Sequence, residues 1–265
     1  MSDALVRYEV SDGVAVLTLT DPPANTYSYD MMRRLDALVL EARMDESVHV
    51  LVLRGAGEKF FCAGADIRML SSVTKRFKYF FCLHASETLN RLEQTPKLVI
   101  AALNGHCVGG GLEVAMAADL RLARKGAGKI GLPEVGLGVL PGTGGTQRLT
   151  RLVGKARAIE LMATGRLFEF EEARALGLVN DVVEAADADT FLVRVKERAR
   201  EFVPPSRASK AVGLIKRAVQ TGSEVSFQEA LALERELQQQ LFESEDAREG
   251  LAAHLEKRKP AFKGR

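Results

Sequence analysis

The alternation of apolar and polar residues at the start of the chain predicts two strands, a helix and a third strand. The strands of residues 5–10 and 14–20 are separated by a Ser-Asp-Gly turn at 11–13, which is typical of a β-hairpin. Residues 28–43 carry apolar side chains at helical spacing, and a serine stands at the N-cap position. Residues 48–53, VHVLVL, form a compact apolar strand. Strand, helix and strand in this order predict a parallel pair joined by a crossover helix.

Helical patterns dominate the remaining chain. Residues 70–95 are predicted to be helical, and the apolar run of residues 98–103 predicts a buried strand. Later predicted elements are five helices and one short strand, with the helices at 149–164, 171–176, 188–202, 208–219 and 226–257 and the strand at 179–183. Two consecutive prolines at 204–205 mark a boundary. We therefore expect a core of residues 1–202 and a C-terminal helical region of residues 203–265 that serves packing or oligomer formation.

Composition narrows the class of protein. A chain of 265 residues with 46% hydrophobic residues is long enough for one large domain with its own core. The net charge of +2, with Lys and Arg spread along the chain, gives no reason to expect nucleic acid as a partner. The sequence contains no apolar stretch that predicts a membrane span and no signal peptide pattern. Three unpatterned cysteines indicate reduced thiols and a cytoplasmic protein.

Glycines gather in residues 104–148, which contain twelve of the 23 glycines of the chain. Glycine permits tight turns and lets a ligand approach backbone N–H groups. The predicted strand of residues 98–103 leads through Gly109-Gly110-Gly111 into a helical pattern. The first N–H groups of such a helix lack partners within the helix and can hold a developing negative charge. Backbone amides are therefore candidate binding groups here.

Two carboxylates lie within this glycine-rich stretch. The residues that share the helical face of Glu113 are glycine, methionine and alanine, so a solvated surface position is not indicated. Glu134 follows a proline in the loop-like segment GLPEVGLG. Together the two residues suggest a general acid and a general base. The alternatives are a first-turn Glu113 that only complements the helix dipole, and an exposed loop carboxylate at Glu134.

A second glycine turn precedes the predicted helix of residues 70–95, in Ala63-Gly64-Ala65-Asp66. The N–H of Ala65 is the group of interest there, and helix capping is a better explanation for Asp66 than catalysis. Neither a P-loop nor a dinucleotide fingerprint is present in the sequence. The pairs Cys82-Leu-His84 and His106-Cys107 lack further ligands at zinc spacing, so no metal site is expected. A Cys-His hydrolase is disfavoured because adjacent residues rarely face each other.

Three motifs resemble the crotonase superfamily, the enoyl-CoA hydratase/isomerase family. They are FCAGADI at 61–67, AALNGHCVGGGLEVAMAADLRLA at 101–123 and GLPEVGLGVLPGTGGTQRL at 131–149. The resemblance extends from about residue 5 to the C-terminus. It implies an α/β fold, a crotonase-type spiral of ββα units with a C-terminal helical region. It also implies a homotrimer, or a homohexamer made of two trimers.

The resemblance implies an acyl-CoA thioester as substrate, with its carbonyl oxygen between the backbone N–H groups of Ala65 and Gly110. The backbone carbonyl of Ala63 is expected to meet the adenine amine. The resemblance also implies six residues that contact the substrate or its CoA: Ala63, Asp66, Ile67, Arg68, Gly142 and Lys257. Lys257 is expected to reach the CoA of a neighbouring subunit. No metal or other cofactor is implied, because the CoA belongs to the substrate.

Two glutamates are the mark of the hydratase branch and match Glu113 and Glu134. By resemblance, Glu113 orients and activates water while Glu134 gives a proton to Cα, although the pair titrates together and the roles could be exchanged. The implied function is an enoyl-CoA hydratase that adds water syn across the 2,3 double bond to give 3-hydroxyacyl-CoA. Alternatives are a hydratase for branched or dicarboxylic substrates such as 3-methylglutaconyl-CoA, an enoyl-CoA isomerase, and a non-catalytic acyl-CoA or RNA-binding scaffold.

Some positions depart from the common pattern of the family. The segment ANTYSYDM at 24–31 has Tyr27 where many members have an Asn-Ala-Leu-like turn, so the region near the pantetheine is expected to differ. His254 stands where some members place an aromatic residue. The aromatic stripe of residues 70–95 is interpreted as core, or as one wall of the acyl pocket. Acyl-chain length and branching are not readable from this sequence.

Overall fold

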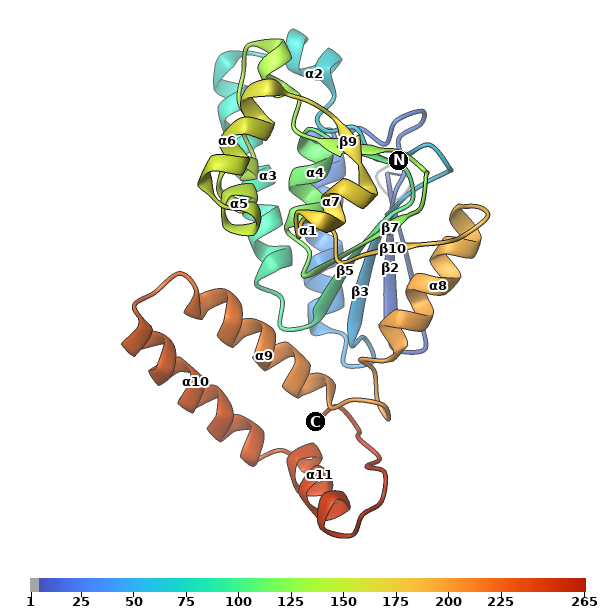
Figure 1. Ribbon diagram of the computed structural model, residues 1–265, viewed down its shortest axis with the longest axis vertical. Coiled ribbons are helices and arrows are strands. Elements are labelled where there is room, and N and C mark those ends of the chain that lie inside the picture. Colours follow the sequence, from blue (N-terminus) through green and yellow to red (C-terminus); the bar gives the residue numbers. More distant parts are fainter. Residues whose placement is uncertain (1–4) are drawn as a thin grey trace.

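The computed structural model describes residues 5–265 and contains two β-sheets with helices packed around them (Figure 1). The larger sheet has the strand order β1-β2-β3-β5-β7-β10. Its strands are β1 (Val6–Ser11), β2 (Val14–Leu19), β3 (Val50–Gly55), β5 (Leu98–Leu103), β7 (Leu120–Arg124) and β10 (Asp181–Val183). Only β1 runs antiparallel to its neighbour; the other pairs are parallel. The predicted hairpin and the predicted parallel crossover are both confirmed.

The smaller sheet was not predicted from the pattern of apolar residues. It has the order β4-β6-β8-β9, with β4 (Phe60–Cys62), β6 (His106–Val108), β8 (Lys129–Gly131) and β9 (Phe168–Glu169). The strands β3, β5 and β7 of the larger sheet are each followed in the chain by a strand of the smaller sheet. Helical segments follow these strand pairs, so the chain repeats a ββα unit. The predicted crotonase-type spiral is confirmed.

Within residues 5–187, eight helical segments surround the sheets. They are α1 (Tyr29–Met44), α2 (Ile67–Ser72), α3 (Lys75–Glu93), α4 (Gly110–Met116), η2 (Glu134–Leu137), α5 (Gly145–Val153), α6 (Lys155–Thr164) and α7 (Phe170–Ala175). The prediction of one helix over 70–95 is wrong, because Val73 is extended and Thr74 caps a new helix. The single helix predicted over 149–164 is also wrong, because the segment belongs to two helices, α5 and α6, which are separated at Gly154 with a φ of 81°.

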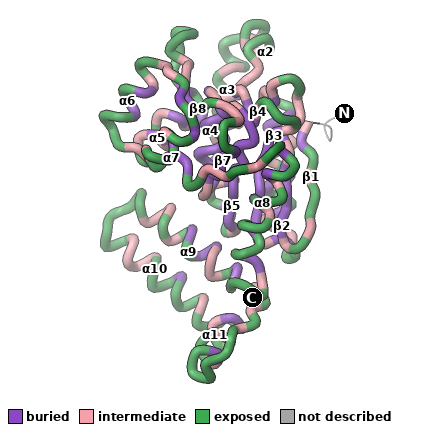
Figure 2. The backbone as a smooth tube through the Cα atoms, turned by 45° about the vertical axis from the view of Figure 1, so that its right-hand side comes forward, coloured by how far each residue is buried: buried purple, intermediate pink, exposed green. Residues whose placement is uncertain are grey.

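The core lies on both faces of the larger sheet, whose inner strands β2, β3, β5 and β7 are buried along most of their length (Figure 2). Apolar residues of α1 and α3 pack on one face, and α8 (Ala188–Arg200) covers the other. Within the predicted aromatic stripe, Phe81 is buried in this core, whereas Phe77 and Phe80 are exposed. The core interpretation of the stripe therefore holds for Phe81 alone among these three residues.

The C-terminal helices α9 (Ser209–Gly222), α10 (Phe227–Phe242) and α11 (Glu245–Leu255) extend away from the sheets (Figure 1). A capping box begins α10, because the Ser226 hydroxyl accepts the N–H of Glu229 and the Glu229 carboxylate accepts the N–H of Ser226. The prediction of one helix over 226–257 is wrong, since Ser244 caps a separate α11. The proposed role of residues 203–265 in trimerisation stays a prediction. Across residues 5–265, no helix has both the length and the apolar character needed to span a membrane.

Candidate active site

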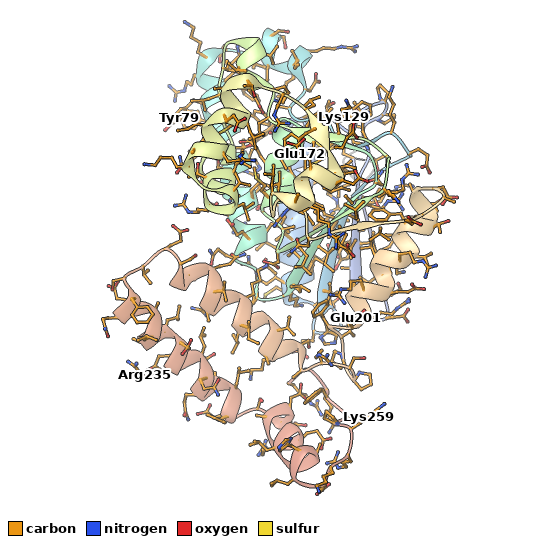
Figure 3. All side chains as sticks on the ribbon, viewed as in Figure 1. Tyr79, Lys129, Glu172, Glu201, Arg235 and Lys259 are labelled. Atoms are coloured by element: carbon orange, nitrogen blue, oxygen red, sulfur yellow. The ribbon has the colours of Figure 1, made fainter. Side chains whose placement is uncertain are left out.

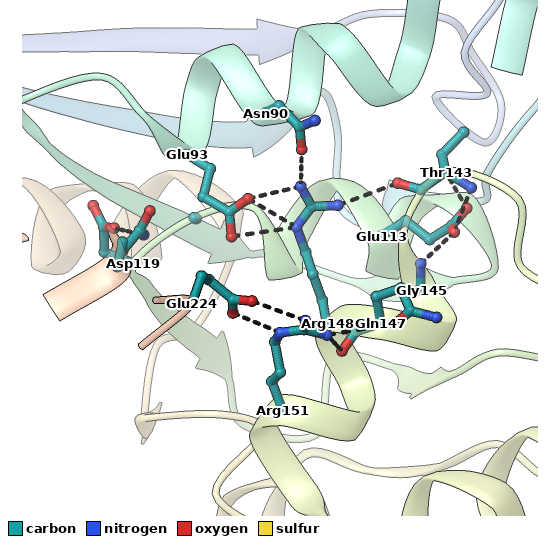
Figure 4. Close-up of polar contacts among 12 residues, drawn as sticks. Asn90, Glu93, Glu113, Asp119, Thr143, Gly145, Gln147, Arg148, Arg151 and Glu224 are labelled. Atoms are coloured by element: carbon teal, nitrogen blue, oxygen red, sulfur yellow. Dashed lines mark hydrogen bonds and ion pairs between the residues drawn. The ribbon is translucent and has the colours of Figure 1, made fainter. Parts of the chain in front are cut away.

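Glu113 is held inside the protein by donors from a loop thirty residues away. Its side chain is only 2% exposed. Its Oε1 atom accepts the N–H groups of Thr143 at 2.8 Å and Gly145 at 2.7 Å, and its Oε2 atom accepts the Thr143 hydroxyl (Figure 4). These bonds offset the cost of burying a carboxylate. The alternative that Glu113 merely complements the dipole of α4 is not supported.

The loop that holds Glu113 depends on glycine. A Cβ atom at Gly145 would lie 2.9 Å from Oε1 of Glu113, and Gly144 adopts the left-handed φ of 108°. Gly145 is also the first residue of α5, so its N–H is one of the groups that have no partner within the helix. The positive end of the α5 dipole therefore faces a carboxylate.

Arg148 secures the same loop from the other side. Its Nη1 atom donates to the backbone oxygen of Thr143 at 3.2 Å, and its Nη2 atom donates to Glu93 at 2.7 Å and to Asn90 at 2.8 Å (Figure 4). Glu93 and Asn90 belong to α3, whereas Arg148 belongs to α5. One guanidinium thus joins two helices to the loop that positions Glu113.

Glu134 has a contrasting environment at the start of η2. Its Oε2 atom is buried and finds no hydrogen-bond partner within residues 5–265. Burial, with a smaller contribution from nearby Glu113, raises the pKa of Glu134 to about 7. A carboxyl group with this pKa is partly protonated near neutral pH and can donate a proton. The alternative of an exposed loop carboxylate is therefore not supported.

The two glutamates flank one backbone turn. A Cβ at Gly109, which has a φ of 58°, would lie 3.2 Å from Oε1 of Glu134. Gly109 is the N-cap of α4, and Glu113 lies in the first turn of that helix. The structure therefore brings both predicted catalytic carboxylates to the start of α4.

The predicted oxyanion donors also meet at this point. Gly64 has a φ of 90°, and a Cβ there would lie 2.9 Å from the backbone nitrogen of Gly110. Tyr27 bridges the neighbours of Ala65, accepting the N–H of Asp66 and donating its own N–H to Gly64. Within residues 5–265, neither the N–H of Ala65 nor that of Gly110 has a recorded acceptor. Both groups therefore remain candidate donors to a ligand.

The other predicted contact residues lie around or away from this centre. Asp66 caps α2 by accepting the N–H of Arg68 at 2.9 Å, so the capping interpretation is confirmed. Ile67 and Arg68 lie on the exposed surface of α2. A Cβ at Gly142, which is also exposed, would contact Sγ of Cys82 at 3.9 Å. Ala63 is half-buried in the loop between β4 and α2.

Lys257 is not near these residues within one chain. It follows α11, with a φ of 55°. In Figure 3, Lys259, two residues further on, lies at the opposite end of the molecule from Tyr79 on α3. The predicted contact of Lys257 with the CoA of a neighbouring subunit stays a prediction.

Sequence reasoning missed the groups that hold Glu113. Thr143 and Gly145 supply its three hydrogen bonds, and Arg148 fixes their loop. A signal was present in the Gly-Thr-Gly-Gly run, where a hydroxyl stands among glycines just before a helix. The sequence places this run in a family motif and implies a substrate contact for Gly142 alone, because nothing local ties Thr143 or Gly145 to a glutamate thirty residues earlier.

Comparison with known proteins agrees with this geometry. The family model described as enoyl-CoA hydratase/isomerase matches residues 9–265. The short-chain-enoyl-CoA hydratase of Clostridium acetobutylicum is 41% identical over 98% of each chain, and the crotonyl-CoA hydratase of Syntrophomonas wolfei is 37% identical over 96% of each. A solved enoyl-CoA hydratase from Geobacillus kaustophilus is 44% identical with a TM-score of 0.94, covering 98% of this chain and 97% of that one.

The protein is thus an α/β enzyme of the crotonase class, and the chain belongs to the enoyl-CoA hydratase/isomerase family. The predicted fold, family and hydratase activity are confirmed by these comparisons.

Proposed function

We propose that this enzyme adds water syn across the 2,3 double bond of a 2-enoyl-CoA thioester, using Glu113 and Glu134. The observation that carries the proposal is the pair of carboxylates at the start of α4, one fixed by three hydrogen bonds and the other with a pKa of about 7. An isomerase needs only one such group to move a proton. The presence of two favours hydration, which requires a held water as well as a transferred proton.

The mechanism assigns each group one task. The N–H groups of Ala65 and Gly110 bind the thioester oxygen and stabilise the enolate charge that develops there. Glu113 orients the water, whose hydroxyl adds to Cβ, and Glu134 delivers a proton to Cα. The proton left from the water returns to the carboxylate pair, so the enzyme ends in its starting state. Because acid, base and charge stabilisation all come from the chain, we propose that no metal or other resident cofactor takes part.

Substrate, assembly and location form the less direct part of the proposal. The names of the Clostridium and Syntrophomonas relatives support a short, straight acyl chain. Large exposed apolar residues on the C-terminal helices support a homotrimer or homohexamer, and they are Ile215, Val219, Phe227, Leu251 and Leu255. Three free cysteines support a cytoplasmic location.

Replacing either glutamate by glutamine tests the catalytic assignment. Each change keeps the shape but removes the acid–base group, so Glu113→Gln and Glu134→Gln should each lower hydration at least about 100-fold. The rate is followed as loss of the conjugated absorbance of crotonyl-CoA. Binding of the CoA ester should survive, because neither carboxylate is proposed to hold the CoA.

Glu41→Gln, which changes an exposed glutamate of α1, is the matched control and should leave the rate unchanged. The double variant should lose less than the product of the single losses, because the pair acts as a unit. If only Glu134 mattered and the double bond merely moved, the isomerase alternative would be correct. If neither mattered and no enoyl-CoA reacted, the scaffold alternative would stand.

A further inference from the structure

Tyr27 brings a buried hydroxyl group to the loop that holds Glu113. Its side chain is 3% exposed, and its ring packs against Phe81 with 6.0 Å between centroids. A Cβ at Gly110 would collide with the hydroxyl oxygen, so the tyrosine lies directly against the start of α4. Its only recorded side-chain hydrogen-bond partner within residues 5–265 is Oγ1 of Thr143, at 3.4 Å.

The chemistry of the three groups sets the direction of their hydrogen bonds. An ionised Glu113 can only accept, so the single hydroxyl hydrogen of Thr143 points to Oε2 of Glu113. Oγ1 of Thr143 then has only lone pairs left for Tyr27, and the tyrosine must donate. Burial, and secondly the charge of Glu113, raises the pKa of Tyr27 well above its usual range, which keeps this donor protonated.

We propose that Tyr27 is a positioning residue, whose hydroxyl orients the Thr143 hydroxyl and through it the carboxylate of Glu113 that holds the water. This inference rests on the proposed hydration. Tyr27 does not need to touch the substrate, because it acts through Thr143. A donor to Thr143 also polarises its hydroxyl and strengthens the bond to Glu113. At 3.4 Å the contact is longer than an ideal hydroxyl hydrogen bond, so we expect no more than the effect of one ordinary hydrogen bond.

Tyr27→Phe removes the hydroxyl and keeps the ring that packs on Phe81. We expect kcat for crotonyl-CoA hydration to fall about fivefold, the effect of one ordinary hydrogen bond, while KM stays within about twofold because the CoA contacts are untouched. Tyr8→Phe is the matched control. Its hydroxyl is also buried, has no recorded partner within residues 5–265 and lies on β1, away from α4, so kcat should not change.

A double-mutant cycle separates positioning through Thr143 from a general structural role. In a Thr143→Val background, which removes the intermediate hydroxyl, Tyr27→Phe should cost no further activity. In a Thr143→Ser background, which keeps it, the roughly fivefold loss should reappear. A cost of the same size in the Thr143→Val background would overturn the inference, because Tyr27 would then act through Gly110 or through the fold.

Failure of this inference can be told apart from failure of the proposed function. If the unaltered protein hydrates no enoyl-CoA, the proposed function is wrong and the positioning role falls with it. If the unaltered protein is active but Tyr27→Phe leaves kcat unchanged, the hydratase assignment stands and only the role of Tyr27 is overturned. Thermal unfolding of each variant shows whether a lost rate reflects a lost fold.

Discussion

Two glutamates of this site differ because their surroundings differ. Glu113 accepts three hydrogen bonds from Thr143 and Gly145, which hold its carboxylate in one orientation. Glu134 has a buried oxygen atom with no partner in the described part of the chain, so its neutral form is favoured and its pKa rises to about 7. Environments that differ in this way assign different tasks to identical side chains. The geometry agrees with a water-holding Glu113 and a proton-donating Glu134.

This contrast predicts the pH dependence of hydration. Glu134 must be protonated to give its proton to Cα, and it loses that proton as the pH rises through about 7. We therefore expect kcat/KM for hydration of crotonyl-CoA to fall above about pH 7, and this limb of the profile to vanish in the residual activity of Glu134→Gln. A rate that rises through the same range would show that the two glutamates have exchanged roles.

Stability provides a check on the same group that is independent of activity. The pKa of Glu134 in the folded protein is raised from 4.5 to about 7, so the folded state binds more protons between these values. Its contribution to stability is full below pH 4.5 and is lost as the pH rises through about 7. The unfolding free energy of the unaltered protein minus that of Glu134→Gln should therefore decrease as the pH rises over this interval.

At the scale of elements, the sequence predicted the six-residue strands and the short strand near 179–183, which is β10, but it missed β7 and the smaller sheet. The pattern of apolar residues identified β2, β3 and β5, because each has six residues and lies in the core. It missed the smaller sheet, whose strands have two or three residues and form only because neighbouring strands supply partners. The site residues Glu113 and Glu134 were identified from local sequence, whereas Thr143 required knowledge of which loops meet in space.

The junction between α3 and α5 gives a prediction at this scale. Arg148 and Glu93 join these helices with side chains that are 11% and 27% exposed. Arg148→Met leaves Glu93 partly buried without its partner, so we expect a loss of unfolding free energy on the order of 3 kcal/mol. We also expect kcat to fall, because the Thr143 carbonyl loses the donor that fixes the loop around Glu113. Urea denaturation and crotonyl-CoA hydration measure the two effects.

The same helix supplies the control. Arg151 makes a similar pair with Glu224, but these side chains are 52% and 48% exposed (Figure 4). Exposed pairs contribute little, so Arg151→Met should cost less than about 1 kcal/mol and leave kcat unchanged. Equal losses in both variants would mean that α5 is weakened in general, and that Arg148 has no special part in holding the loop.

At the scale of the whole molecule, α9 joins the C-terminal helices to the core. Lys216 of α9 forms an ion pair with Asp119 at 2.8 Å, and both side chains are nearly buried. Burial is the main cause that lowers the pKa of Lys216 and raises the pKa of Asp119. A cleft of about 900 Å³ lies between α9 and the helices α3 and α5. The helices beyond α9 extend away from the sheets (Figure 1).

This shape makes Lys257 a test of assembly as well as of binding. Lys257 follows α11, and α11 lies at the opposite end of the molecule from α2, where Arg68 lies (Figure 1). If Lys257 contacts the CoA phosphates of a neighbouring subunit, Lys257→Ala should raise KM for crotonyl-CoA and leave KM for a crotonyl-pantetheine ester unchanged, because pantetheine lacks the nucleotide phosphates. Lys259→Ala, a change at another exposed lysine of the same tail, should affect neither value.

An equal rise in KM for both esters would show that Lys257 does not recognise the phosphates. A selective rise in a protein that sedimentation shows to be monomeric would contradict the assignment to a neighbouring subunit.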